Sequence, residues 1–186
     1  PNGFSDWQAA VGPANFEGFA TNMGNASTLN ISADLTSSAN GGLGTSGIHR
    51  VSGQELDLWW GNDGQRFSAF TWTFTDPITA FFADFISFDS IGSTGLSVSF
   101  VENGVNQTVN ISALVVGLSR GVGLTFDHGI SSLVFSTTDG YDNGQIDNLY
   151  YASASAVPVP AALPLLASGL GALGFFGWRR KRSAGV

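Results

Sequence analysis

Hydrophobic and polar residues alternate with a period of two through most of the chain. Residues 70–74 read Phe-Thr-Trp-Thr-Phe and residues 96–100 read Leu-Ser-Val-Ser-Phe. Successive side chains of a β-strand point to opposite faces, so this pattern predicts strands with one buried face and one solvated face. Further strands are predicted at residues 56–60, 80–88, 107–114, 123–126, 131–136 and 145–151.

Clusters of glycine, asparagine, aspartate and serine separate the predicted strands. Glu102-Asn103-Gly104 lies between two of them, and an Asn-Gly pair accepts the positive φ that a tight hairpin turn requires. No stretch before residue 160 has a helical period. The pattern therefore predicts an all-β protein whose residues 1–152 form an antiparallel β-sandwich of the jelly-roll type.

The pattern changes at the C-terminal end of the sequence. Residues 161–178 form an uncharged apolar run, and four basic residues follow it: Arg179, Arg180, Lys181 and Arg182. As a helix the run would be about 27 Å long, close to the roughly 30 Å of hydrocarbon in a bilayer, so we predict a transmembrane helix. A buried core helix is the alternative, but it would not normally end on four positive charges. Because Lys and Arg stay on the cytoplasmic side, residues 179–186 are predicted to be cytoplasmic and residues 1–156 to lie outside the cytoplasm.

Residues 153–160 are predicted to be a linker that ends in a proline motif. The motif reads Val157-Pro158-Val159-Pro160-Ala161. Its prolines fix φ and favour extended conformations at the residues before them, which would give a processing enzyme an extended strand to grip. The simpler alternative is that the prolines only stop the helix from growing into the linker.

The proline motif, the apolar run and the basic cluster, in this order, resemble the PEP-CTERM group of exosortase-sorted bacterial proteins, in the variant whose motif reads Val-Pro-Leu-Pro-Ala. Val159 stands where the PEP motif has glutamate. The resemblance implies that a membrane-embedded exosortase of a Gram-negative bacterium recognises the tail and cleaves near the motif. It also implies a transient stay in the inner membrane, with the N-terminal domain in the periplasm, before delivery to the cell surface or extracellular matrix. For this topology we expect a signal peptide in the precursor.

Charge and cysteine content limit the partners and the chemistry. Outside the basic cluster, three arginines against 14 carboxylates leave a net charge of −11, which argues against nucleic acid as a partner. The sequence has no cysteine, so disulfides, thiolate catalysis and cysteine-ligated zinc are excluded.

The predicted first and last strands resemble those of carbohydrate-binding-module-like jelly rolls. They contain residues 15–19, Asn-Phe-Glu-Gly-Phe, and 145–150, Gln-Ile-Asp-Asn-Leu-Tyr. The resemblance implies a structural calcium between Glu17 and Asp147, which could supply carboxylate oxygens if the two terminal strands pair. Residues 139–144 are a second oxygen-rich cluster, for which a solvated turn is the alternative.

Trp59 and Trp60 suggest sugar binding, because aromatic rings stack on pyranose rings. The two are neighbours on a predicted strand and must point to opposite faces, so at most one can lie in the core. A packed core residue beside an ordinary half-exposed aromatic residue is the alternative.

The sequence offers little support for catalysis. His49 and His128 are the only histidines, neither lies in a hydrolase motif, and His49 beside Arg50 is interpreted as part of a surface loop. We therefore expect an exported, non-enzymatic β-sandwich with a structural or adhesive role. The alternatives are a carbohydrate-binding module for extracellular polysaccharide and a secreted glycoside hydrolase.

Overall fold

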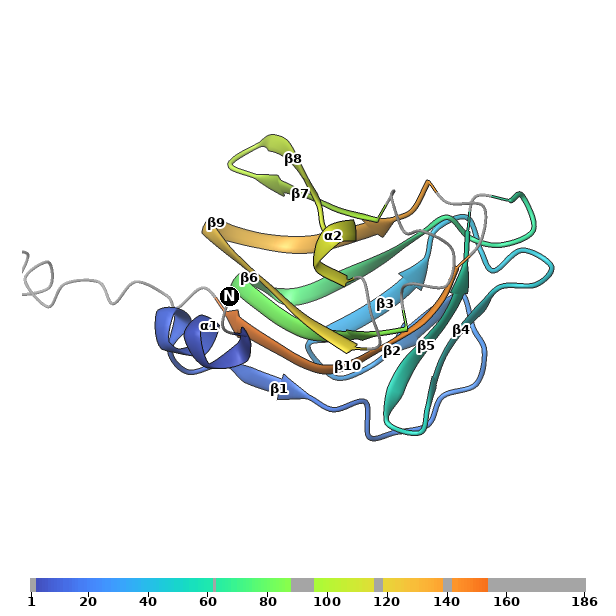
Figure 1. The fold of residues 1–186 in the computed structure, drawn as a ribbon, viewed down its shortest axis with the longest axis horizontal. Helices are drawn as coiled ribbons and strands as arrows, with labels where there is room; N and C mark the ends of the chain where they lie inside the picture. The colour runs from blue at the N-terminus through green and yellow to red at the C-terminus, as the bar shows by residue number, and fades with distance from the viewer. Residues whose placement is uncertain (1–2, 62, 88–95, 116–118, 139–141, 154–186) are drawn as a thin grey trace, which may run out of the picture. The chain divides into compact units, whose positions relative to one another are not determined.

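Two 18-residue antiparallel strands, β6 (Ala69–Ile86) and β9 (Ser119–Ser136), run through the middle of the fold (Figure 1). The computed structural model describes residues 3–61, 63–87, 96–115, 119–138 and 142–153. The pairing of β6 with β9 is interrupted by two register shifts between Thr73 and Ala80, on either side of the Ile78–Ile130 pair. Pro77 lies in this interval, and proline cannot donate a backbone hydrogen bond to the ladder. The interruption divides each long strand into two halves that belong to different layers.

The remaining strands extend the two layers. Layer A contains the second half of β6 and the first half of β9, together with β10, β5, β4 and the short β1. Layer B contains the first half of β6 and the second half of β9, together with β3, β2, β7 and β8. The bounds are β1 Asn15–Glu17, β2 Thr28–Asn30, β3 Leu35–Ala39, β4 Ile48–Ser52, β5 Glu55–Trp60, β7 Ser97–Glu102, β8 Val105–Asn110 and β10 Asp142–Ser153.

An aromatic core joins the two layers. Phe135 of layer B contacts Phe81 and Phe85 of layer A, with ring centroids 6.1 and 6.0 Å apart. Trp60 of layer A lies 5.4 Å from Phe70 of layer B. All of these rings are fully buried, and burying one large apolar side chain stabilises the fold by about 1.5–3 kcal/mol. The prediction of an antiparallel β protein is therefore confirmed.

The hairpin turn predicted at residues 102–104 is present, and the first and last strands of the sandwich pair with each other. Asn103 and Gly104 connect β7 to β8 with φ values of 50° and 76°, as a two-residue turn requires. The first strand, β1, pairs with the last, β10.

Two helices contradict the expectation that no helix precedes the tail. The predicted strand at 107–114 ends at Asn110, and α2 (Ser112–Val115) follows. The Asn110 side chain accepts a hydrogen bond of 3.0 Å from the Ser112 N–H, which favours a turn over a continued strand.

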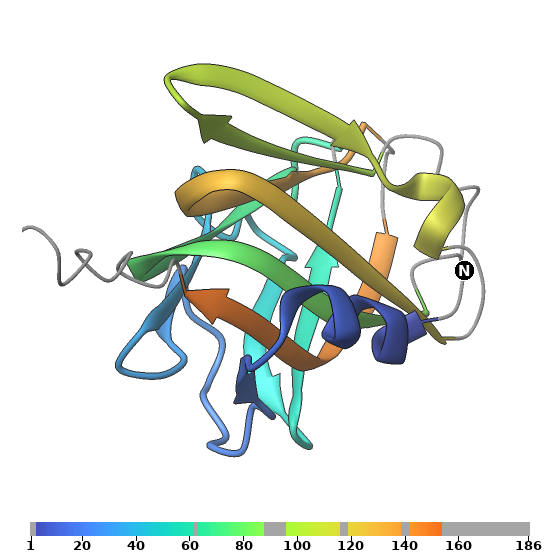
Figure 2. The ribbon, with the colours of Figure 1, turned by 90° about the vertical axis from the view of Figure 1, so that its left-hand side faces the viewer.

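The second unexpected helix, α1 (Gly3–Val11), packs against layer A (Figure 2). Only Trp7 is buried in it, and this ring lies over Gly123, where a Cβ atom would be 2.6 Å from Trp7 Cδ1. So short a helix depends on tertiary packing, not on its own periodicity.

The chain divides into two units, Pro1–Ala154 and Ser155–Val186. The predicted linker, proline motif, transmembrane helix and basic tail lie almost entirely in the second unit, outside the described residues. Among the residues that are described, no helix is long and apolar enough to cross a bilayer.

Candidate functional site

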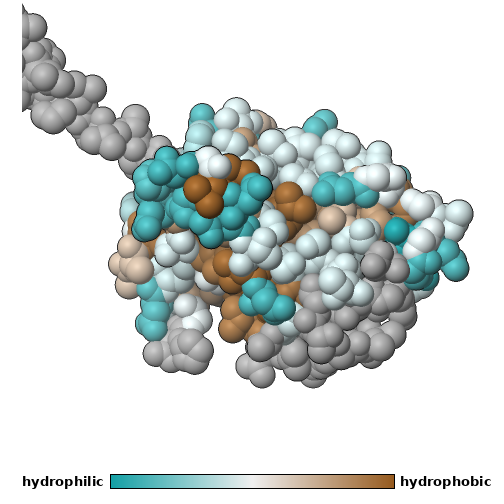
Figure 3. All heavy atoms as spheres, turned by 90° about the horizontal axis from the view of Figure 1, so that it is seen from above, coloured by the Kyte–Doolittle hydropathy of each residue, from teal (hydrophilic) through white to brown (hydrophobic). Residues whose placement is uncertain are grey.

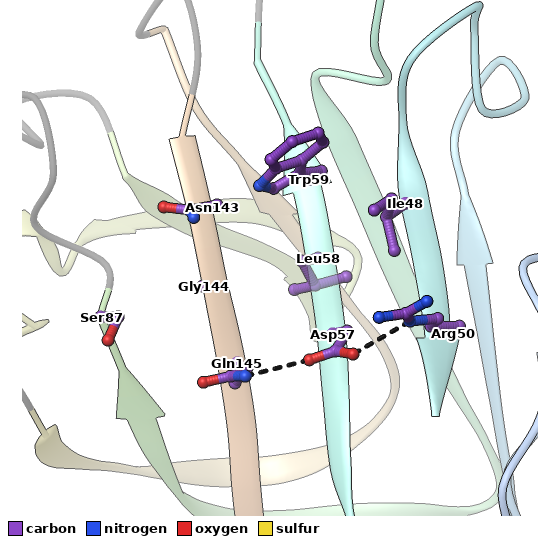
Figure 4. Close-up of a pocket in the computed structure, with 9 residues that line it drawn as sticks. All are labelled: Ile48, Arg50, Asp57, Leu58, Trp59, Ser87, Asn143, Gly144 and Gln145. Carbon is purple, nitrogen blue, oxygen red and sulfur yellow. Dashed lines mark hydrogen bonds and ion pairs between the residues drawn. The ribbon is translucent and has the colours of Figure 1, made fainter. Parts of the chain in front are cut away.

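Trp59 and Trp60 of β5 point to opposite faces of layer A, as predicted. Trp60 is 0 % exposed and packs in the core, whereas Trp59 is 37 % exposed on the outer face. Figure 4 shows the Trp59 ring standing above the strand beside the neighbouring strands β4 and β10. The outer face around this ring is the candidate site.

Side chains from three strands form two rows across the site. Ile48, Trp59 and Asn143 are opposite one another on β4, β5 and β10, and Arg50, Asp57 and Gln145 form the next row. Residues directly opposite in an antiparallel sheet share a face. The rows enclose a pocket of about 360 Å³, which is lined by Ile48, Arg50, Asp57, Leu58, Trp59, Ser87, Asn143, Gly144 and Gln145.

Asp57 is the centre of the polar row. One of its carboxylate oxygens accepts a hydrogen bond of 3.0 Å from Arg50 Nε, and the other accepts one of 3.1 Å from Gln145 Nε2 (Figure 4). The three side chains therefore hold one another in place. Together they present both donors and acceptors beside an aromatic ring.

Arg66 supports the aromatic end of the site. Its guanidinium carbon lies 5.8 Å from the centroid of the Trp59 ring, a cation–π distance. Asp63 forms an ion pair with Arg66 and also accepts hydrogen bonds from the backbone N–H groups of Gln65 and Arg66. The loop that contains Asp63 and Arg66 is thus held in place beside the Trp59 ring.

The opposite end of the site is acidic. Burial raises the pKa of Glu55, and the nearby charges of Asp147 and Asp57 raise it further. These carboxylates disfavour an anionic ligand at this end, because like charges repel.

A second pocket of about 360 Å³ lies between layer A and the start of α1. It is lined by Gly3, Phe4, Phe82, Asp84, Gly121, Asn148 and Tyr150. Asn148, at a β-bulge and with a φ of 48°, donates a hydrogen bond of 3.0 Å to Asp84. The strained backbone directs the amide towards this pocket.

The structure pairs the strands of Glu17 and Asp147 but gives the two carboxylates different neighbours. Glu17 is opposite Leu149 and accepts a hydrogen bond of 2.7 Å from the Phe19 N–H, whereas Asp147 lies near Glu55. Among the described residues, no group of three or more histidine or acidic side chains could hold a metal ion. The calcium site stays a prediction.

His49 corrects a prediction, because it is a buried strand residue and not part of a surface loop. It is 0 % exposed on β4, with Nδ1 2.7 Å from the Ala26 carbonyl oxygen and Nε2 2.8 Å from Ser37 Oγ. Burial lowers the pKa of His49. Ser37 is also 0 % exposed, so this serine–histidine pair has no access to a substrate in the folded structure.

Sequence reasoning identified Trp59 but missed its polar neighbours. Arg50 meets Asp57 across the β4–β5 hairpin, and Gln145, 88 residues further along the chain, joins them only through the pairing of β10 with β5. The alternation at residues 55–60 was the one available signal, because it places Asp57 and Trp59 on the same face.

Comparison with known proteins supports the interpretation of the C-terminal tail. The PEP-CTERM protein-sorting motif matches residues 156–182, so the predicted resemblance is confirmed. These residues include the whole proline motif and the basic cluster. No curated protein sequence matches the chain.

Several solved structures are similar to the β-sandwich. A carbohydrate-binding module of family 29 is 13 % identical, with a TM-score of 0.42, and the match covers 75 % of this chain and 89 % of that one. The K2 cleaved adhesin domain of Lys-gingipain is 11 % identical, with a TM-score of 0.41 and coverage of 75 % and 99 %. A xylanase from Clostridium thermocellum, solved as CBM22-1 and GH10 modules with xylohexaose, is 15 % identical, with a TM-score of 0.37 and coverage of 77 % and 29 %.

Proposed function

We propose that this chain is an exported protein that an exosortase processes at its C-terminal motif, leaving the β-sandwich at the cell surface or in the extracellular matrix. The match to the sorting motif at residues 156–182 supports export and sorting. An apolar run between a proline motif and a basic cluster is suited to temporary retention in the inner membrane. Cleavage near Val157–Ala161 would then separate the sandwich from the membrane.

Mass spectrometry of the mature protein from its native host tests the processing step. We expect a C-terminal peptide that ends near the motif and lacks Arg179–Val186. Replacement of Pro158 and Pro160 by alanine should leave the tail attached, because the extended recognition segment is lost. A mature wild-type protein that still carries the complete tail would contradict processing.

We assign the adhesive role of the sandwich to the Trp59 site, with a neutral saccharide as the ligand. The observation that carries this assignment is the exposed Trp59 ring beside the Arg50–Asp57–Gln145 row. An aromatic face provides stacking area, and fixed amide, carboxylate and guanidinium groups can bind ring hydroxyls. A pocket with an apolar surface and a few convergent polar groups is typical of ligand sites.

The charges around the pocket favour a neutral ligand over an acidic one. Arg50 is already paired with Asp57 and Arg66 with Asp63, while Glu55 and Asp147 add negative charge at the other end. A uronate-rich polysaccharide would therefore meet net repulsion, which salt would weaken.

Binding to polysaccharides tests this assignment. The chain should bind a neutral polysaccharide more tightly than a uronate-rich one. Trp59→Ala should weaken binding by about tenfold or more, since buried tryptophan contacts dominate binding energies. Val101→Ala, which removes exposed apolar surface from layer B, is the matched control and should bind normally. No binding to a glycan array or to insoluble polysaccharides would remove the saccharide from the proposal.

We further propose that the sandwich has no enzymatic activity. Both members of the Ser37–His49 pair are buried, and Asp57 is engaged on both of its oxygens. Hydrolysis of a bound oligosaccharide, followed by chromatography of the products, would contradict this proposal.

A further inference from the structure

The β8 strand is an open edge of layer B. Among the described residues, it is last in the strand order and pairs only with β7. Five of its six residues are exposed, and Val109 is half-buried. β7 pairs with β9 only through Ser97–Ser99, so the far part of the β7–β8 hairpin extends beyond the rest of the layer (Figures 1 and 2).

Along the β8 edge, the backbone groups that face away from β7 have no partner strand in the part of the chain that the structure describes. In an antiparallel pair, every second residue turns its N–H and C=O away from the partner strand. Such a row is a template for another strand. The β4 edge of layer A differs, because Met23 exchanges two backbone hydrogen bonds with Val51, of 2.9 and 3.1 Å.

Nothing in the sequence of β8 protects this edge. Its residues, Val-Asn-Gln-Thr-Val-Asn, include no charge and no proline, and its register with β7 continues without a bulge. Charged residues, prolines and bulges are the usual means of blocking unwanted strand pairing. Glu102, at the turn end of β7, is directed to the His128 N–H, with a hydrogen bond of 3.0 Å.

The surface beside β8 is neutral, whereas the protein outside its tail carries a charge of −11 from three arginines and 14 carboxylates. Hydroxyl groups pair with each other across the outer face of layer B, at 2.8 Å between Ser99 and Thr108 and 3.0 Å between Ser97 and Ser136. From above, pale and teal residues cover much of the described surface, with brown residues between them (Figure 3). Exposed Val101 and Val105, at 52 % and 57 %, lie near the hairpin turn.

We infer that the β8 edge binds a second copy of this chain. The two β8 strands pair antiparallel about a two-fold axis, so that both copies of layer B form one continuous sheet. The neutral edge fits a second copy, because two strongly acidic molecules approach each other most easily where neither presents a carboxylate. Amide side chains of asparagine and glutamine add hydrogen bonds between paired strands. The interface does not depend on the saccharide assignment, and it would join two Trp59 sites in one particle.

Disulfide trapping tests the interface. Single cysteines are placed at different positions of the full chain, in detergent, and the yield of disulfide-linked dimer is compared. The sequence has no cysteine, so single variants report one site each. Gln107→Cys and Thr108→Cys lie at the middle of β8, and symmetry brings one of them close to its own copy. We expect at least one to form a disulfide dimer with a yield about tenfold above that of Asn30→Cys, on the short edge strand β2. Equal yields at all three positions would overturn the inference.

An added charge provides a second, independent readout. The charge is added to whichever of the Gln107→Cys and Thr108→Cys variants forms more disulfide dimer. In that variant, Asn106→Asp should reduce the dimer yield by about tenfold, because like charges across a two-fold interface repel. Asn40→Asp adds the same charge at an exposed turn and should have no effect. Unchanged melting temperatures for both variants exclude unfolding as the cause, and equal yields from both would overturn the inference. Saccharide binding by the untrapped chain is measured separately, so failure of one proposal does not imply failure of the other.

Discussion

The outer faces of the two layers have the same strand pattern but different chemistry. In layer A, the row Arg50, Asp57 and Gln145 carries charges next to the exposed ring of Trp59. In layer B, one row crosses six strands with a single apolar residue and no charge: Thr28, Ser38, Thr71, Val134, Ser99 and Thr108. Alternation alone determines which residues face outwards, whereas residue type determines what each face can bind.

Polar side chains pair with each other on both faces. Thr28 lies 3.3 Å from Ser38, and Ser99 lies 2.8 Å from Thr108, so hydroxyl pairs complete the surface of layer B. In layer A, the charged row is fixed beside a pocket. A pocket of about 340 Å³ also lies on layer B, between β7, β8 and β9, but no charged side chain lines it. Layer A therefore differs from layer B by the charged row and the exposed tryptophan beside its pocket.

Substitution of the two neighbouring tryptophans should give the largest contrast. Trp60→Ala should destabilise the protein by about 3–5 kcal/mol, because it opens a cavity in the core between the layers. Trp59→Ala should cost much less, since its ring is 37 % exposed. Denaturant unfolding measures both values. Equal losses would show that the Trp59 ring serves the stability of layer A and would contradict its assignment as a ligand-binding surface.

A glycine substitution tests how layer A holds α1. Gly123→Ala places a Cβ atom 2.6 Å from Trp7 Cδ1, and such overpacking costs about 1–3 kcal/mol. Gly24→Ala meets no atom within 4 Å and is the matched control. Thermal unfolding should separate the two variants. A Gly123→Ala protein as stable as the control would contradict the close packing of α1 on the sheet.

The buried His49 should make stability depend on pH. Because burial lowers the pKa of His49 below 6.5, the unfolded chain takes up a proton at a higher pH than the folded protein. Stability should therefore fall as pH decreases below about 6.5, until the folded pKa is passed. His49→Gln should reduce this pH dependence, and His128→Gln, at an exposed position, should retain it. Urea unfolding between pH 5 and 7.5 provides the measurement.

Removal of calcium should have the smallest effect on stability, because the two carboxylates of the predicted site, Glu17 and Asp147, have different neighbours. If calcium links the terminal strands, a chelator should lower the melting temperature by a few degrees, as expected when a ligand binds only the folded state. Glu17→Gln should abolish that difference. An unchanged midpoint with chelator would remove calcium from the account.

The alternation of apolar and polar residues predicted most strands correctly, because one face of most strands is buried. The alternation at residues 70–74 places Phe70, Trp72 and Phe74 in the core. Local pattern could not show that the strands predicted at 70–74 and 80–88 are halves of a single strand, because the bend depends on pairing with β9. The short helix α1 was missed for the same reason, since its main anchor is one tryptophan on a distant glycine.

The candidate site was predictable only in part. Trp59 followed from a local rule, whereas Arg50 and Gln145 join Asp57 through strand order. His49 was assigned to a loop because its partner Ser37, on another strand, cannot be recognised from neighbouring residues. The sorting motif was recognisable because its three parts are contiguous in sequence.

The most direct test of the account is to map, by amide chemical shifts in NMR spectra, where a neutral oligosaccharide contacts the sandwich. We predict that the shifted resonances cluster on β4, β5 and β10 around Trp59 and Gln145, and that Trp59→Ala abolishes them. Shifts that cluster on the hydroxyl rows of layer B, or no shifts with any neutral oligosaccharide, would contradict the assignment of the binding face to layer A.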